Sequence, residues 1–184
     1  DVELEPAEEE KSRDVVDHAG IEDLTNSPPR THILSNGELS TLISHSGTGY
    51  SFSKDLTLTR WRADVVTDQH GMFFYVRDLD NGSYWSIGHQ PVQRNPDRYD
   101  SWFHAGKVQI ARVDDWIESF MEVCVSPEDN IELRKVTLTN YSNRKRRIEL
   151  TSYAEVVLNT QQADRSHPAF SNLFVQSEYI HEHH

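Results

Sequence analysis

Apolar and polar residues alternate along most of the chain after residue 30, in short runs that turn residues separate. Alternation with a period of two predicts half-buried β-strands, because successive side chains of a strand point to opposite faces. The short connections favour antiparallel pairing, since parallel strands need long crossovers. We therefore predict an all-β fold, a sandwich of two large antiparallel sheets. The expected strands cover residues 32–34, 39–44, 56–61, 72–76, 84–87, 107–113, 116–125, 131–139, 148–158 and 172–179.

The two longest runs, residues 116–125 and 131–139, lie on either side of Pro127 and Asn130. Proline cannot donate to a strand ladder, and asparagine tolerates a left-handed turn. We predict that the two runs form one long antiparallel pair. Three further turn signals mark where strands reverse: Asn36-Gly37, Asp80-Asn81-Gly82 and Asp114-Asp115.

The segment SGTGYSFSKDLTLTRWR, residues 46–62, has three interpretations: a phosphate cradle, a sugar-reading loop or an ordinary turn. Gly47-Thr48-Gly49 begins like a dinucleotide-binding motif, but the third glycine is missing. The following residues predict a strand, so no helix N-terminus would face an anion. Lys54 does not follow a glycine, as a Walker motif requires. The phosphate interpretation is therefore disfavoured.

The alternating end of this segment predicts which side chains share a face. Leu56 and Leu58 are expected to be buried together, with Arg60 at the end of the same face. Tyr50 and Ser51 precede the strand, and we expect them in a surface loop. The opposite face carries Thr57, Thr59 and Trp61.

Charge is unevenly distributed along the 184 residues, whose formal net charge is −12. Residues 1–30 carry ten Asp or Glu against three Lys or Arg, which predicts an acidic arm or linker before a domain at 31–184. A short helix over residues 7–18 is a further interpretation of the arm. No basic stripe indicates a nucleic-acid partner, and the basic run 143–147 is interpreted as a solvated hairpin end.

The single cysteine, Cys124, excludes an internal disulfide framework and fits a reducing compartment. No apolar stretch approaches the length that spans a bilayer, and no secretory signal pattern opens the chain. We therefore expect a cytoplasmic location.

Candidate catalytic residues form no recognisable pattern. Glycosidases need two carboxylates on opposite sides of a bond, and no pair stands out. His89 and His104 are interpreted as loop contacts rather than metal ligands, and no nucleophile elbow is present. The sequence predicts no catalytic residue, metal site or cofactor. The carboxylates considered are Asp114, Asp115, Glu118, Glu128, Asp129 and Glu155.

Recognition of a sugar is the remaining interpretation, because aromatic rings stack on pyranose faces while amides, carboxylates and Arg bind hydroxyls. The alternative for each aromatic residue is a place in the sandwich core. The candidate aromatic residues are Tyr50, Trp61, Trp85, Trp102 and Trp116, and the candidate polar residues are Arg60, Arg62, His89, Gln90 and Arg98.

Five blocks occur together in a recognisable order: SNGELSTLISHSGTGYSFSKDLTLTRWR, WSIGHQPV, MEVCVSPEDNIELRKVTLTN, RRIELTSYAEVVL and HPAFSNLFVQSEY. They resemble the N-terminal β-domain of glycoside hydrolase family 94, formerly glycosyltransferase family 36. The resemblance covers about residues 30 to 180. The last two blocks are most similar to the cyclic β-1,2-glucan synthase branch, and the family also includes cellobiose and chitobiose phosphorylases.

The resemblance implies an antiparallel supersandwich similar to galactose mutarotase, placed before an (α/α)6 barrel that holds the catalytic acid and the phosphate site. This chain is shorter than the family's complete β-domain, which implies a truncated sandwich without its own catalysis. It further implies a cytoplasmic protein, or the cytoplasmic portion of an inner-membrane protein. Gly47 and Gly49 would then form a tight turn.

Three functions follow as hypotheses. The first is a carbohydrate-associated domain that contacts a β-glucan or gluco-oligosaccharide through Tyr50, Ser51, Arg60, Trp85 and Gln90, on an exposed edge turned toward sugar or the barrel. The second is a scaffold or homodimerisation module that packs on the barrel without touching sugar. The third, a mutarotase-type epimerase, is weak because it needs a catalytic Glu and paired His that the sequence does not place.

Overall fold

The computed structural model describes residues 15–26, 28–62 and 68–180. These residues form mainly strands, with three short helices, α1 (Asp23–Asn26), α2 (Gln161–Ser166) and α3 (Pro168–Asn172). None of these helices has the length and apolar character needed to cross a membrane. The strands are β1 (Val15–Gly20), β2 (Thr31–Ser35), β3 (Leu39–Ser44), β4 (Gly49–Ser53), β5 (Leu56–Thr59), β6 (Phe73–Asp78), β7 (Tyr84–Ser86), β8 (Arg98–His104), β9 (Val108–Asp114), β10 (Ile117–Val125), β11 (Glu132–Asn140), β12 (Ile148–Tyr153) and β13 (Val156–Thr160).

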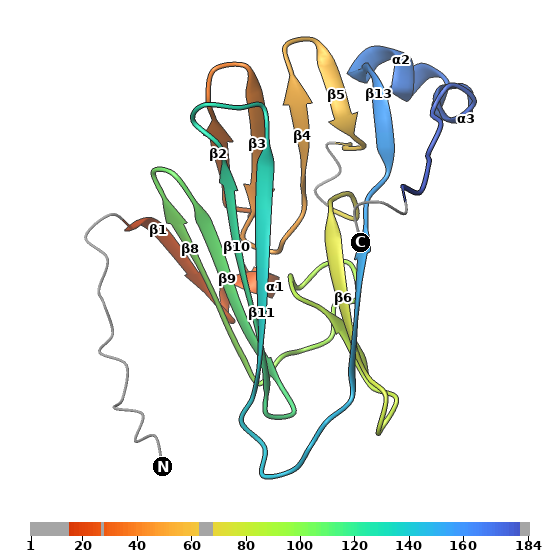
Figure 1. The fold of residues 1–184 in the computed structure, drawn as a ribbon. Coiled ribbons are helices and arrows are strands. Elements are labelled where there is room, and N and C mark those ends of the chain that lie inside the picture. The colour runs from red at the N-terminus through yellow and green to blue at the C-terminus, as the bar shows by residue number, and fades with distance from the viewer. Residues whose placement is uncertain (1–14, 27, 63–67, 181–184) are drawn as a thin grey trace.

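The described strands pair into three antiparallel sheets. The first sheet has the order β1-β8-β9-β10-β11, the second β13-β5-β4-β3-β2, and the third β12-β6-β7. β12 runs on into β13, so one stretch of chain contributes to both the third and the second sheet (Figure 1). This arrangement is nearly all antiparallel β-structure, as the alternating sequence predicted.

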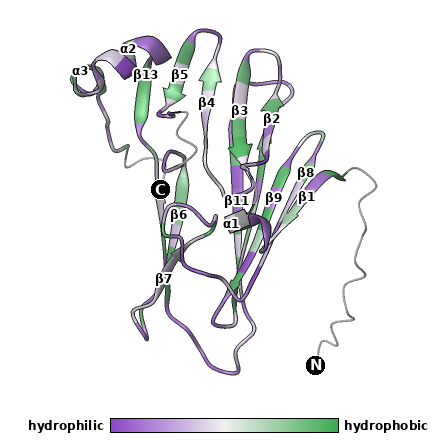
Figure 2. Ribbon diagram, turned by 180° about the vertical axis from the view of Figure 1, so that it is seen from behind, coloured by the Kyte–Doolittle hydropathy of each residue, from purple (hydrophilic) through white to green (hydrophobic). Residues whose placement is uncertain are grey.

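One apolar core joins the three sheets. It contains Phe103 and Ile110 of the first sheet, Ile43 of the second, and Val76 and Trp85 of the third. The first sheet therefore packs against the other two as a sandwich. Figure 2 shows the hydrophobic residues concentrated in the strands, while the connecting loops are largely hydrophilic.

The predicted long pair is confirmed. β10 and β11 pair continuously from Ile117 opposite Asn140 to Val125 opposite Glu132. The three predicted turns are also present, between β2 and β3, between β6 and β7, and between β9 and β10. The Asn, Asp and Gly residues of these turns thus predicted the chain reversals correctly.

Several predicted elements differ from the structure. Val15–Gly20, inside the predicted acidic arm, forms β1 and pairs with β8, so residues 15–18 are not helical. The remainder of the helix predicted over residues 7–18 lies outside the described residues. The strand predicted over 172–179 is wrong, because Pro168–Asn172 is helical and no strand follows it up to residue 180. β8 was not predicted at all. The domain boundary at residue 31 stays a prediction.

The predicted burial of β5 is also wrong. Leu56 is 48% exposed, whereas Thr57 and Thr59 are buried. Thr57 lies opposite Phe52 of β4 and Thr59 opposite Val156 of β13, and the Thr59 hydroxyl accepts from the Ser51 N–H at 2.9 Å. β11, the edge strand of the first sheet, contacts β3 and β4 through Glu132, whereas β5 lies one strand farther along the second sheet.

Candidate functional site

The five predicted sugar-contacting residues do not form one surface. Tyr50 and Ser51 are neighbours in β4 and point to opposite faces, rather than lying in a surface loop. Arg60 follows β5 directly, Trp85 lies in β7, and Gln90 lies in the loop after β7. The strand character of β4 therefore divides the predicted site.

Tyr50 lies on an aromatic surface that we call the Tyr50 surface, made of Tyr50, Phe52 and Trp61. The Tyr50 ring stacks on Trp61 with ring centroids 4.9 Å apart and planes 13° apart, and on Phe52 at 5.0 Å and 26°. All three side chains are partly exposed. Burial raises the pKa of the Tyr50 hydroxyl, so the group is neutral near pH 7. Flat, partly exposed rings of this kind can pack against the apolar face of a pyranose.

Arg60 is committed to contacts within its own chain. Its Nη2 donates to Asp164 Oδ1 at 3.0 Å, and its Nη1 donates to Glu155. The hydrogen bond to Asp164 is the main cause of the raised pKa of Arg60. Because Asp164 belongs to α2, the guanidinium holds that helix against the end of β5. The Arg60 guanidinium could bind sugar hydroxyls only if these ion pairs broke.

Ser51 lies in a polar cluster between the first and second sheets. Its hydroxyl donates to Glu132, which also accepts from Thr41 Oγ1 at 2.6 Å and pairs with Arg134 Nε at 2.5 Å. Burial alone would raise the pKa of Glu132, but the charge of Arg134 and the two hydroxyl donors outweigh it and lower the pKa. The sequence reasoning missed Glu132, whose only signal is the Glu-x-Arg spacing that brings Arg134 onto the same face of β11.

Trp85 belongs to the core, and the prediction that it lies on an exposed edge is wrong. Its side chain is fully buried, and its indole N–H donates to Ser119 Oγ at 3.2 Å. β7 pairs with β6, with Trp85 opposite Val76, which directs the indole toward the first sheet. The polar residues after Ser86 form a loop, but Trp85 itself stays in β7 and is buried.

The loop that carries Gln90 packs against the glycine turn at residues 46–49. The Gln90 N–H donates to the Ser46 carbonyl at 3.1 Å. A Cβ on Gly47, whose φ is 88°, would lie 2.8 Å from the Gly88 Cα. The tight turn predicted for Gly47 and Gly49 includes Gly47, whose N–H donates to the Ser44 carbonyl at 3.0 Å, whereas Gly49 is the first residue of β4. Gly47 also allows the close backbone approach to Gly88.

A fully buried arginine fixes the same loop from the other side. Arg112 donates to the carbonyls of Gly88 at 3.1 Å and Arg94 at 2.8 Å, and its Nε and Nη2 pair with both oxygens of Asp114. His89 belongs to the same loop, and its Nδ1 has no hydrogen-bond partner among the described residues. Its pKa is lowered by burial first, and then by the charges of Arg112 and His45. Across the described ranges, no three His, Cys, Asp or Glu side chains gather as a metal site.

Comparison with known proteins identifies one family model and several similar proteins. The family model described as "Glycosyl hydrolase 94, supersandwich domain" matches residues 20–184. The cyclic beta-(1,2)-glucan synthase NdvB of Rhizobium meliloti (strain 1021) is 35% identical over 158 residues, which is 86% of this chain and 6% of that protein.

Two phosphorylases are also similar. The N,N'-diacetylchitobiose phosphorylase of Vibrio proteolyticus is 29% identical over 148 residues, covering 78% of this chain and 18% of the relative. The solabiose phosphorylase of Paenibacillus borealis is 37% identical over 86 residues, covering 47% of this chain and 11% of the relative. The chain thus spans less than a fifth of the length of each of these relatives.

Proposed function

Because the chain belongs to the glycosyl hydrolase 94 supersandwich domain family, we propose that it is a non-catalytic, carbohydrate-associated domain of a larger enzyme. That enzyme would be a β-glucan phosphorylase or a cyclic β-1,2-glucan synthase, and it would carry the catalytic barrel as a separate domain. The named activities of the relatives, on β-1,2-glucan and on disaccharides, support a saccharide as the partner. A location in the cytoplasm, or in the cytoplasmic portion of an inner-membrane protein, is part of the same proposal.

The observation that carries this proposal is the Tyr50 surface. The near-parallel stack of Tyr50 and Trp61 extends one flat apolar face across two rings. The Glu155 carboxylate, whose side chain is 38% exposed, offers a polar group beside Arg60 at the end of β5. A β-linked gluco-oligosaccharide presents apolar ring faces and hydroxyls in a similar combination.

A second candidate function is a packing module for the barrel or for a second copy of the chain. The segment after β13 exposes large apolar side chains, with Phe174 72% exposed and Phe170 and Leu173 also exposed. An exposed apolar stretch of this kind is typical of a surface that packs on a partner. In this interpretation the domain would position the catalytic part without binding sugar.

The two functions are separated by titrating the 184-residue chain with β-1,2-gluco-oligosaccharides in a calorimeter. Replacing Tyr50 or Trp61 with alanine should weaken binding about fivefold, the loss expected for one stacking ring worth about 1 kcal/mol. Phe174→Ala is the matched control, because it removes an exposed ring from another surface. Absence of affinity in both this chain and its parent enzyme would reject the sugar-binding function in favour of the packing module.

A further inference from the structure

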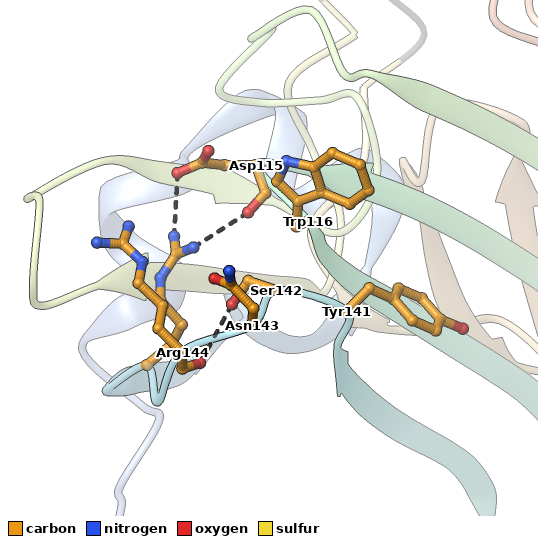
Figure 3. A pocket seen from close by; sticks show the side chains of 7 residues that line it. Asp115, Trp116, Tyr141, Ser142, Asn143 and Arg144 are labelled. Carbon is orange, nitrogen blue, oxygen red and sulfur yellow. Dashed lines mark hydrogen bonds and ion pairs between the residues drawn. The ribbon is translucent and has the colours of Figure 1, made fainter.

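A separate pocket lies at the end of the sandwich where β9 turns into β10 and β11 leads into β12. Its volume is about 420 Å³, and Figure 3 shows Trp116 and Tyr141 on one side with Asp115 and Arg144 on the other. The pocket is lined by Asp115, Trp116, Tyr141, Ser142, Asn143, Arg144 and Arg146. None of these residues belongs to the Tyr50 surface.

The two aromatic side chains of this pocket are unusually exposed. Trp116 is 67% and Tyr141 58% exposed. Trp116 also has φ of 67°, as the second residue of a two-residue turn whose first residue, Asp115, has φ of 51°. Asparagine and glycine are the residues that suit such a turn. A tryptophan at position 116 therefore neither suits the left-handed backbone of the turn nor packs in the core. Folding alone does not account for a tryptophan here.

A buried ion pair holds the pocket in place. The side chain of Arg146 is almost fully buried and pairs with the fully buried side chain of Asp78. The same guanidinium donates to the Asp115 carboxylate at 3.0 Å and to the Asp115 carbonyl at 3.2 Å. The Tyr141 N–H donates to the Trp116 carbonyl at 2.8 Å. These hydrogen bonds hold the backbone of Trp116 and Tyr141 in place without a ligand.

Polar groups suited to hydroxyls surround the rings. Within the described part of the chain, neither the Arg144 guanidinium nor the Asn143 amide makes a hydrogen bond, so their donors remain available. Asp115 keeps a 42% exposed carboxylate. A planar cation, an amide and a carboxylate beside an indole are the groups that bind vicinal hydroxyls while the ring stacks on the sugar.

We propose that this pocket is a saccharide-binding site for a neutral gluco-oligosaccharide, independent of the Tyr50 surface. Trp116 provides the stacking ring, and Asp115, Asn143 and Arg144 bind hydroxyls. A polyanion is the competing ligand, because residues 143–147 are basic. Two of the four cationic side chains in that run are already paired, however, since Arg146 pairs with Asp78 and Asp115, and Arg147 with Asp80 at 2.7 Å. This compensation favours the neutral ligand.

The test is a pair of substitutions at Trp116 in the 184-residue chain, each titrated with β-1,2-gluco-oligosaccharides by calorimetry. Trp116→Gly removes the ring and suits the positive φ, so the melting temperature should stay unchanged or rise. Binding at this pocket should weaken by about fivefold or more. Trp116→Phe keeps a stacking ring and should retain most of the affinity. Tyr50→Ala, measured in parallel, reports on the other surface alone.

The outcomes separate this site from the proposed function. If Trp116→Gly removes one class of binding site and Tyr50→Ala does not, the pocket is a saccharide site in its own right. If Trp116→Gly leaves every binding constant unchanged, the proposal is overturned, even if Tyr50→Ala weakens binding. Binding of a sulfated oligosaccharide but not the neutral one, with a steep salt dependence, would overturn it in favour of a polyanion site.

Discussion

Two tryptophans that look alike in the sequence, Trp85 and Trp116, have opposite environments. Trp85 is fully buried, with its indole N–H satisfied by Ser119. Trp116 is 67% exposed, at a turn whose backbone suits glycine or asparagine. Both stand beside polar residues and a turn signal. The local composition is therefore the same in kind, and the position relative to the strand register decides which ring enters the core.

This difference assigns different tasks to the two regions. Around Trp85, rings and aliphatic side chains from three sheets fill the sandwich, and substitution should damage the fold. Around Trp116, the fold is provided by Arg146, Asp78 and the strand pairing, while the ring itself contributes little packing. Substitution there should change binding and leave stability intact.

The largest expected effect is at Trp85. Trp85→Ala should lower the free energy of unfolding by about 3–5 kcal/mol, because it leaves a large cavity in the core. Trp116→Ala should change it by less than about 0.5 kcal/mol, as most exposed substitutions do. Urea denaturation of both variants measures the contrast. Equal losses at the two positions would show that the ring of Trp116 packs after all.

The buried pair of Arg112 and Asp114 should rank next. Arg112→Met removes the closer of the two cations that pair with buried Asp114, leaves only Arg94 Nε at 3.5 Å, and should cost about 3 kcal/mol. The loop at residues 88–94 should also become more accessible, since two of its carbonyls lose their donor. Hydrogen exchange of that loop is the measurement. The double variant Arg112→Met with Asp114→Leu should recover much of the stability, and a failure to recover would mean that the loop contacts dominate.

Acid should destabilise the domain in two steps of smaller size. The pKa of His89 lies below its ordinary value of 6.5, so the unfolded chain binds more protons than the folded one as the pH falls below 6.5. Glu132 has a pKa lowered from 4.5, so its contribution is present above that pH and is lost as the pH falls through its folded pKa.

Stability measured against pH should resolve the two steps. His89→Gln should flatten the decline just below pH 6.5, and Glu132→Gln should flatten the one below pH 4.5. A His89→Gln profile that still declines in the upper window would assign that step to another group.

The sequence predicted the architecture better than the surfaces. Alternation and turn residues are local features of the sequence. They correctly predicted the strands of the sandwich and the β10–β11 pair. The faces of β5 were reversed, since burial of Thr57 and Thr59 depends on which neighbouring strands cover them. Glu132 and the Arg60–Asp164 pair were missed because their partners lie about 80 to 100 residues away in the chain. Such contacts are properties of the assembled sheets.

Saccharide binding by the exposed aromatic residues is tested most directly by an NMR titration of the 184-residue chain with β-1,2-gluco-oligosaccharides. We predict saturable shifts at the indole N–H signals of Trp61 and Trp116, with the signal of the buried Trp85 indole unchanged. The absence of shifts at both exposed positions, in this chain and in the larger enzyme proposed to contain it, would contradict a carbohydrate-associated role.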